Sequence, residues 1–85
     1  MVTIKKEKRQ INVRVFAIYE LVYDGESYAI SCMEQSKWGE CLDFCRVPDF
    51  TRDEKCANSI YETIVKNGVC ACTLFDIVND LICWN

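Results

Sequence analysis

The chain has 85 residues, a length typical of one domain, and we treat residues 1–85 as a single unit. Hydrophobic residues make up 51% of the chain, slightly above the roughly 45–50% usual for globular proteins, which argues against a disordered polypeptide. The net charge of −3 is unevenly distributed, because four basic residues against Glu7 give residues 1–10 a charge of +3 and leave −6 for the remainder.

The basic segment at residues 1–10 predicts either a solvated N-terminal arm or the start of an edge strand. It is not followed by the apolar run of a secretory signal, and no stretch reaches the ~18 consecutive apolar residues of a membrane span. We therefore expect a cytoplasmic protein that does not contact a membrane. A nucleic-acid partner is not expected, because the basic stripe does not continue into the rest of the chain.

Residues 11–23 are rich in β-branched and aromatic side chains and predict one long strand. Asp24-Gly25 follows at once and is typical of a tight hairpin, so residues 26–33 are expected to form the partner strand. A two-residue turn would give three cross-strand pairs on one face of the sheet: Leu21 with Tyr28, Tyr19 with Ile30, and Ala17 with Cys32. This face is more apolar than the opposite one, so we expect the helices to cover it.

A polar turn at residues 35–39 precedes a third predicted strand, residues 40–47, which Pro48 should end because proline cannot donate to a strand ladder. Alternation places Leu42 and Phe44 on one side of this strand. It places Cys41, Cys45 and Val47 on the other side.

The segment from Thr51 to Glu54 matches a capping box, which predicts a helix that begins there and ends at Gly68. Its apolar stripe is expected to contain Cys56, Ala57, Ile60, Tyr61, Ile64 and Val65.

A short extended piece at residues 69–72 should lead to Thr73, the expected N-cap of a final helix with Asp76 at its third position. The apolar stripe of that helix contains Leu74, Ile77, Val78, Leu81 and Ile82. The elements together predict an α+β fold, with a three-stranded antiparallel β-meander packed against two C-terminal helices.

The chain contains seven cysteines, and an odd number argues against a complete disulfide framework. Free cysteines are among the most frequently buried residues and pack as small hydrophobic side chains. We therefore interpret most of them as core residues, above all Cys32 and Cys56.

Two alternatives to a core role remain open for Cys70 and Cys72. The chain has no histidine, so a metal site would need four thiolates, and these two residues would lie ~6.6 Å apart on one face of an extended segment. A redox role would depend on Cys72, whose position before a helix N-terminus favours the thiolate. We expect neither role, and no metal or other cofactor.

Catalytic chemistry is not expected, because the sequence has no histidine, no nucleophile motif and only three glycines for a phosphate-binding loop. Trp38 and Trp84 are large amphipathic residues of the type found at interface centres. An exposed sheet edge offers a second kind of contact, with a partner protein or with another copy of the chain.

The sequence thus favours a non-enzymatic protein-interaction or regulatory module. One alternative is a cysteine-thiolate metal-binding or redox protein. Another is a small acidic inhibitor that imitates nucleic acid, which would need its carboxylates in one contiguous patch.

The second half of the chain carries a family resemblance. Three features resemble a family of small bacterial proteins of unknown function: the phrase Val47-Pro48-Asp49-Phe50-Thr51, a helix with Ala57, Ile60 and Ile64 followed by Asn67-Gly68-Val69, and a closing helix with Asp76 and Asp80. The resemblance implies a short meander with two helices and no assigned activity. Cys70 and Cys72 depart from the family pattern, which has polar residues or proline there.

Overall fold

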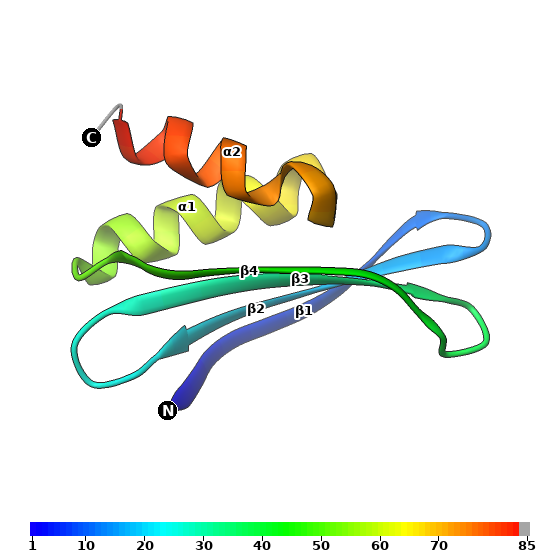
Figure 1. Cartoon of the computed structure of the whole chain (residues 1–85), viewed down its shortest axis with the longest axis horizontal. Helices are drawn as coiled ribbons and strands as arrows, with labels where there is room; N and C mark the ends of the chain where they lie inside the picture. Colours follow the sequence, from blue (N-terminus) through cyan, green and yellow to red (C-terminus); the bar gives the residue numbers. More distant parts are fainter. Residues whose placement is uncertain (84–85) are drawn as a thin grey trace.

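The chain forms one antiparallel sheet with two helices packed on it (Figure 1). The computed structural model describes residues 1–83, so Trp84, a predicted contact residue, lies outside the described residues. The strands are β1 (Val2–Asn12), β2 (Val15–Tyr23), β3 (Tyr28–Ser36) and β4 (Cys41–Thr51), in the order β1-β2-β3-β4. Helices α1 (Glu54–Asn67) and α2 (Ala71–Cys83) cover the same face of the sheet (Figure 1).

The α+β class, the antiparallel sheet and the two C-terminal helices are confirmed, but the predicted count of three strands is wrong. The described chain has four, because a turn at Val13 and Arg14 divides the segment predicted as one long strand. In this turn the Asn12 carboxamide oxygen accepts a hydrogen bond from the Arg14 amide at 2.9 Å. Most of the basic segment therefore belongs to β1, an edge strand that pairs along its length with β2.

The hairpin between β2 and β3 has a four-residue loop rather than the predicted two-residue turn. The Asp24 carboxylate accepts hydrogen bonds from the amides of Glu26 and Ser27, each at 2.9 Å, and this bonding holds the longer loop. The cross-strand pairs shift by two residues as a result, so that Leu21 pairs with Ile30. A shift of two keeps every side chain on its face, and the expected covered face is correct. All six of its predicted members are buried: Ala17, Tyr19, Leu21, Tyr28, Ile30 and Cys32.

Strand β4 does not end at Pro48 but continues to Thr51. It is the second edge strand, where a missing amide donor leaves no partner unsatisfied. Between the pairs Ile30–Val47 and Tyr28–Thr51, three residues of β4 oppose one of β3, and Asp49 has a positive φ of 50°. The proline is accommodated by this irregularity rather than by the end of the strand.

Helix α1 begins at Glu54 with Asp53 as its N-cap, so the predicted capping box at Thr51 is wrong. The Asp53 carboxylate accepts from the Lys55 amide at 3.0 Å, while Thr51 Oγ1 accepts from the Asp53 amide at 3.2 Å. The predicted end is confirmed, because Gly68 has φ 59° and its amide points at the last carbonyls of the helix.

Helix α2 begins at Ala71, two residues before the predicted N-cap Thr73. The Thr73 amide and hydroxyl both donate to the Cys70 carbonyl, at 3.2 and 3.3 Å, and Ala71 is buried in the core. The predicted extended piece is thus wrong, and Cys72 lies within the helix. The expected apolar stripe packs against the core, with Leu74 and Val78 fully buried.

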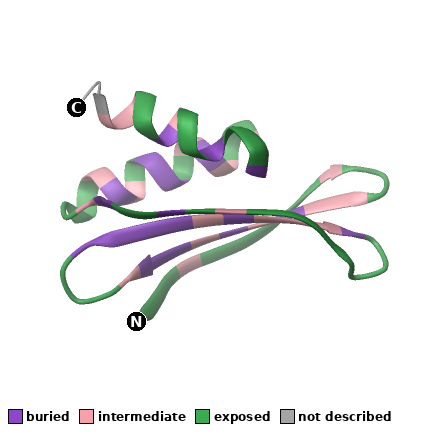
Figure 2. Cartoon of the chain, viewed as in Figure 1, coloured by how far each residue is buried: buried purple, intermediate pink, exposed green. Residues whose placement is uncertain are grey.

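The core lies between the sheet and the helices, and Figure 2 shows buried residues on β2, β3 and both helices but a mostly exposed β1. Two buried tyrosines link the layers. Tyr19 donates its hydroxyl to the Val69 carbonyl at 2.8 Å, and Tyr61 donates to the Tyr19 carbonyl at 3.3 Å. Burial raises the pKa of Tyr61 to about 12 and the pKa of Tyr19 further still, so both hydroxyls remain donors.

Candidate functional site

One face of the sheet has no helix packed on it (Figure 1). Residues that pair directly across strands share a face, so the strand register identifies its members. We call this surface the open face. Its members are Thr3, Lys6, Lys8 and Gln10 of β1; Phe16, Ile18, Glu20 and Val22 of β2; Ala29, Ser31, Met33 and Gln35 of β3; and Cys41, Phe44 and Arg46 of β4.

An apolar patch occupies the middle of the open face. Ile18 pairs with Met33, and Met33 pairs with Phe44, so these side chains form a row across three strands. Phe16 lies two residues from Ile18 on the same side of β2 and completes the patch. Phe44 is 56% exposed, and the other three are half-buried. Single exposed apolar residues are normal on a protein surface, but a contiguous group on an uncovered face is typical of a contact site.

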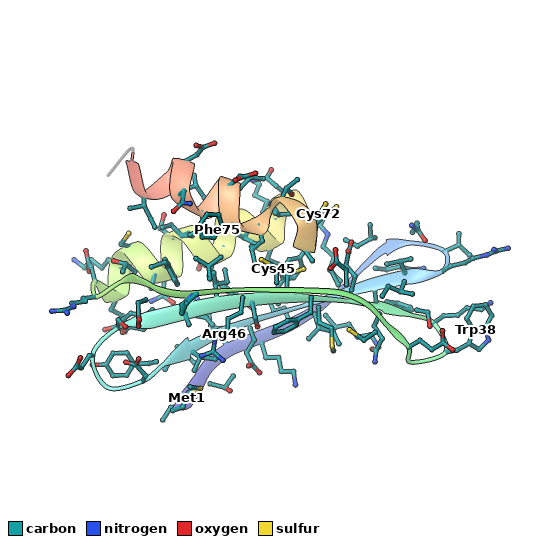
Figure 3. All side chains as sticks on the ribbon, viewed as in Figure 1. Met1, Trp38, Cys45, Arg46, Cys72 and Phe75 are labelled. Carbon is teal, nitrogen blue, oxygen red and sulfur yellow. The ribbon has the colours of Figure 1, made fainter. Side chains whose placement is uncertain are left out.

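Basic side chains surround the apolar patch. Lys8 pairs with Ile18 and so lies at the β1 end of the row that contains Met33 and Phe44. Its Nζ lies 4.6 Å from the centre of the Phe16 ring. Lys6 and Arg46 lie at opposite ends of the next row, on the two edge strands. Figure 3 shows Arg46 on the side of the sheet away from the helices, beside Met1, and its Nη2 is 3.6 Å from the Met1 sulfur. We call Lys6, Lys8 and Arg46 the basic rim.

None of the basic-rim cations forms an ion pair within residues 1–83, although Glu20 lies across from Lys6 on the neighbouring strand. Glu20 is the one carboxylate among the open-face residues, so this face carries +2 in a chain whose net charge is −3. The open face therefore combines an apolar centre with an electrostatic preference for anionic groups.

The other basic residues of β1 face the helices. Lys5 Nζ lies 3.4 Å from a carboxylate oxygen of Glu62, and Arg9 Nη1 donates to the carbonyls of Val65 and Lys66 at 2.5 and 2.8 Å. Those carbonyls belong to the last turn of α1, where a cation also interacts favourably with the helix dipole. The basic segment thus divides into residues that hold α1 and residues of the basic rim.

The cysteines have less uniform surroundings than the sequence suggested. Cys32 is fully buried, its sulfur lies 3.7 Å from the Val69 carbonyl oxygen, and burial raises the pKa of its thiol to about 12. Its cross-strand partner Cys45 and the helical Cys56 are partly buried against the core. Cys41 and Cys72 are exposed, so the core role expected for most of the cysteines does not extend to these two. A register shift at Leu42 pairs Cys41 with Gln35 and removes it from the side of Cys45.

Cys70 and Cys72 do not form the arrangement expected for a metal or redox pair. Cys70 precedes α2 and is half-buried, whereas Cys72 is in its first turn and exposed, so the two do not share one face of a strand. Burial raises the pKa of the Cys70 thiol, which disfavours the thiolate that a metal site would need from this residue. Within the part of the chain that the structure describes, no three Cys, Asp or Glu side chains are placed to hold a metal ion.

Trp38 lies at the β3–β4 turn with 72% of its surface exposed, next to Lys37, whose Nζ is 4.9 Å from the ring centre (Figure 3). It does not fold over the sheet edge. Phe75, on the outer side of α2, is 54% exposed and was not predicted as a surface residue of interest. Neither Trp38 nor Phe75 belongs to the apolar patch.

The apolar patch itself was not predicted from the sequence. Its one sequence signal was the alternation that places Leu42 and Phe44 on the same side of their strand. That signal does not show that Phe44 pairs with Met33, because the pairing depends on the strand register.

No pocket for a small molecule is present in residues 1–83. Neither of the two helices described combines the length and apolar character needed to cross a bilayer. A comparison with protein-family models, curated proteins and solved structures found no match to this chain, which agrees with a resemblance only to proteins of unknown function.

Proposed function

We propose that this protein is a non-enzymatic interaction module of the cytoplasm that binds a partner protein through the open face of its sheet. The observation that supports the proposal is the apolar patch beside the basic rim, whose cations form no ion pair in residues 1–83, on the one face of the sheet that the helices leave uncovered. Apolar side chains outside the core contribute little to folding, whereas they contribute strongly to association once a partner covers them. A cytoplasmic setting suits a chain with seven cysteines, because thiols stay reduced there.

The face is better suited to a partner than the sheet edges, where the sequence suggested strand addition. Strand β1 has register irregularities between Thr3 and Lys5 and between Gln10 and Asn12, and β4 contains Pro48 beside a wide irregularity. Bulges, proline and lysine on an edge strand are the features that natural proteins use to prevent another strand from pairing. The proposal therefore assigns the contact to the open face.

The other candidate functions have less support. A thiolate site would require cysteines that converge, and the half-buried Cys70 and exposed Cys72 differ in surroundings. An acidic mimic of nucleic acid would require one contiguous patch of carboxylates. Glu20, Glu62 and Asp80 instead lie on β2, α1 and α2, on both sides of the sheet.

The chain offers a matched pair of phenylalanines for a test. Phe44 lies in the apolar patch and Phe75 on α2, and they are 56% and 54% exposed. We expect Phe44→Ala to reduce capture of one specific protein from a lysate of the source cells at least tenfold, a difference of about 1.4 kcal/mol. Phe75→Ala should leave capture unchanged. Quantitative mass spectrometry with equal amounts of folded bait measures both.

Two outcomes would contradict the proposal. One is equal capture by the wild-type chain and Phe44→Ala. The other is a loss of capture with Phe75→Ala alone, which would assign the contact to the helical side of the molecule. Circular dichroism of each variant distinguishes lost binding from lost folding.

A further inference from the structure

We infer that the open face binds a short polypeptide segment that carries carboxylates beside apolar side chains. This inference rests on the proposed function and specifies the chemistry of its partner. It follows from charge complementarity and from the dimensions of the surface, and each supports the same occupant.

The charge argument begins with the positions of the cations. Lys6 and Lys8 lie on β1 and Arg46 on β4, so the apolar patch has positive charge on both sides. Lys6 lies directly across from Glu20, but Lys8 and Arg46 pair with Ile18 and Ser31, so a partner carboxylate would not have to displace another from these two. A segment with apolar residues flanked by Asp or Glu would complement both parts of the surface.

The size of the surface favours a segment over a large globular partner. Three strand spacings of about 4.8 Å separate β1 from β4, so the cations on the two sides are roughly 14 Å apart. That width accommodates one strand or one helix of about 10–12 Å diameter. The apolar patch itself has only four residues, so a single segment is enough to cover it.

Single-stranded nucleic acid fits this surface less well. Stacking of successive bases needs several free aromatic faces, but Phe44 is the one exposed ring of the patch, since the Phe16 ring lies under the Lys8 ammonium. Ile18 and Met33 are aliphatic. Three cations also give only a few phosphate contacts, and these supply most of the affinity for nucleic acid.

A second copy of the chain is also disfavoured. Two open faces placed together would bring two surfaces of charge +2 against each other, and like charges across an interface weaken association. The partner segment therefore belongs to another protein, with negative charge at the positions that contact the basic rim.

The test uses the full chain and a fluorescein-labelled synthetic peptide of about 12 residues that alternates glutamate with leucine and phenylalanine, a length sufficient to span the sheet face. Three reference molecules have the same length: the peptide with lysine for glutamate, the peptide with serine for its apolar residues, and single-stranded oligo-dT. Fluorescence anisotropy should show that the acidic apolar peptide binds at least tenfold more tightly than each of the three. Its affinity should fall as salt is added, because the contact is partly electrostatic.

Charge-matched variants locate the binding. Replacing two cations of the basic rim, Lys8→Glu with Arg46→Glu, should weaken binding of the acidic peptide at least tenfold. The control replaces two exposed cations near the start of α1, Arg52→Glu with Lys55→Glu, and should have no more than a twofold effect. The two double variants change the net charge by the same amount.

The possible failures are distinguishable. If oligo-dT binds more tightly than the acidic peptide, the partner is a nucleic acid rather than an acidic segment. If the lysine peptide binds as tightly as the acidic peptide, the charge argument is wrong. If none of the peptides binds but Phe44→Ala still abolishes capture from the lysate, the interaction function stands and the acidic-segment inference falls. If both tests fail, the proposed function fails with it.

Discussion

The two faces of the sheet are built from alternate residues of the same strands, but they have different surroundings. On the covered face, Tyr19, Ile30 and Cys32 have no exposed surface. On the open face, their close neighbours Ile18 and Met33 remain half-buried, because only flanking side chains cover them. Both faces are therefore partly apolar, and the helices determine which of them becomes the core.

The difference extends to the charged residues of β1. Lys5 and Arg9 face α1 and bond to it, whereas Lys6 and Lys8 face solvent without an ion pair in residues 1–83. One side of the strand thus uses its charges to hold the fold, and the other leaves its charges free for a partner. Three predictions use matched residues on the two faces to test this contrast.

The largest expected effect is on thiol reactivity. Cys32 lies on the covered face and Cys41 is exposed on β4. Burial raises the pKa of Cys32 from its usual 9.0 to about 12, which lowers its thiolate fraction at pH 8 about a thousandfold, since each pKa unit is a factor of ten. Cys32 is also closed to solvent, so iodoacetamide should alkylate the exposed Cys41 rapidly and Cys32 far more slowly, measured by peptide mass spectrometry over time. Similar rates for the two would mean that the helices do not seal the covered face.

The next largest effect is on stability. Ile30→Ala removes a fully buried side chain from the covered face and should lower the free energy of unfolding by about 2–5 kcal/mol. Ile18→Ala makes the same chemical change on the open face and should cost about 1 kcal/mol or less, because Ile18 is only half-buried. Urea unfolding followed by circular dichroism measures both. An equal loss in the two variants would show that the open face belongs to the folding core.

The apolar face of β2 and β3 was predictable because side chains alternate with period two. The loop of residues 24–27 shifted the pairs by two, which moved the partners but left Tyr19, Leu21 and Ile30 on the same face. The loop length itself was not predictable, since Asp24-Gly25 suits a two-residue turn as well. In the structure, the Asp24 carboxylate holds the longer loop by accepting from the amides of Glu26 and Ser27.

The edge strand and the apolar patch were less accessible to sequence reasoning. Most residues of β1 are charged or polar, so the strand forms through pairing with β2 and bonds to α1 rather than through strand propensity. The local signal for its turn was Asn12, whose side chain bonds the backbone two residues on. The patch unites residues of three strands, and only the register brings Ile18, Met33 and Phe44 into one row.

The smallest expected effect compares adjacent residues of β1. Arg9→Met removes the bonds to the Val65 and Lys66 carbonyls and should lower the free energy of unfolding by about 0.3–1 kcal/mol, the usual range for a cation at a helix C-terminus. Lys8→Met removes a neighbouring cation that faces solvent, and it should change the free energy of unfolding by less than about 0.5 kcal/mol.

Amide hydrogen exchange locates the difference between these two variants. The Gly68 and Val69 amides donate to carbonyls of the last turn of α1, and they should exchange faster in Arg9→Met because this end of the helix loses its side-chain donor. The same amides should keep their exchange rates in Lys8→Met. Equal acceleration in both would mean that the charge of β1 as a whole, rather than the side on which each residue lies, stabilises the helix. That result would remove the distinction between residues that hold the fold and residues available to a partner.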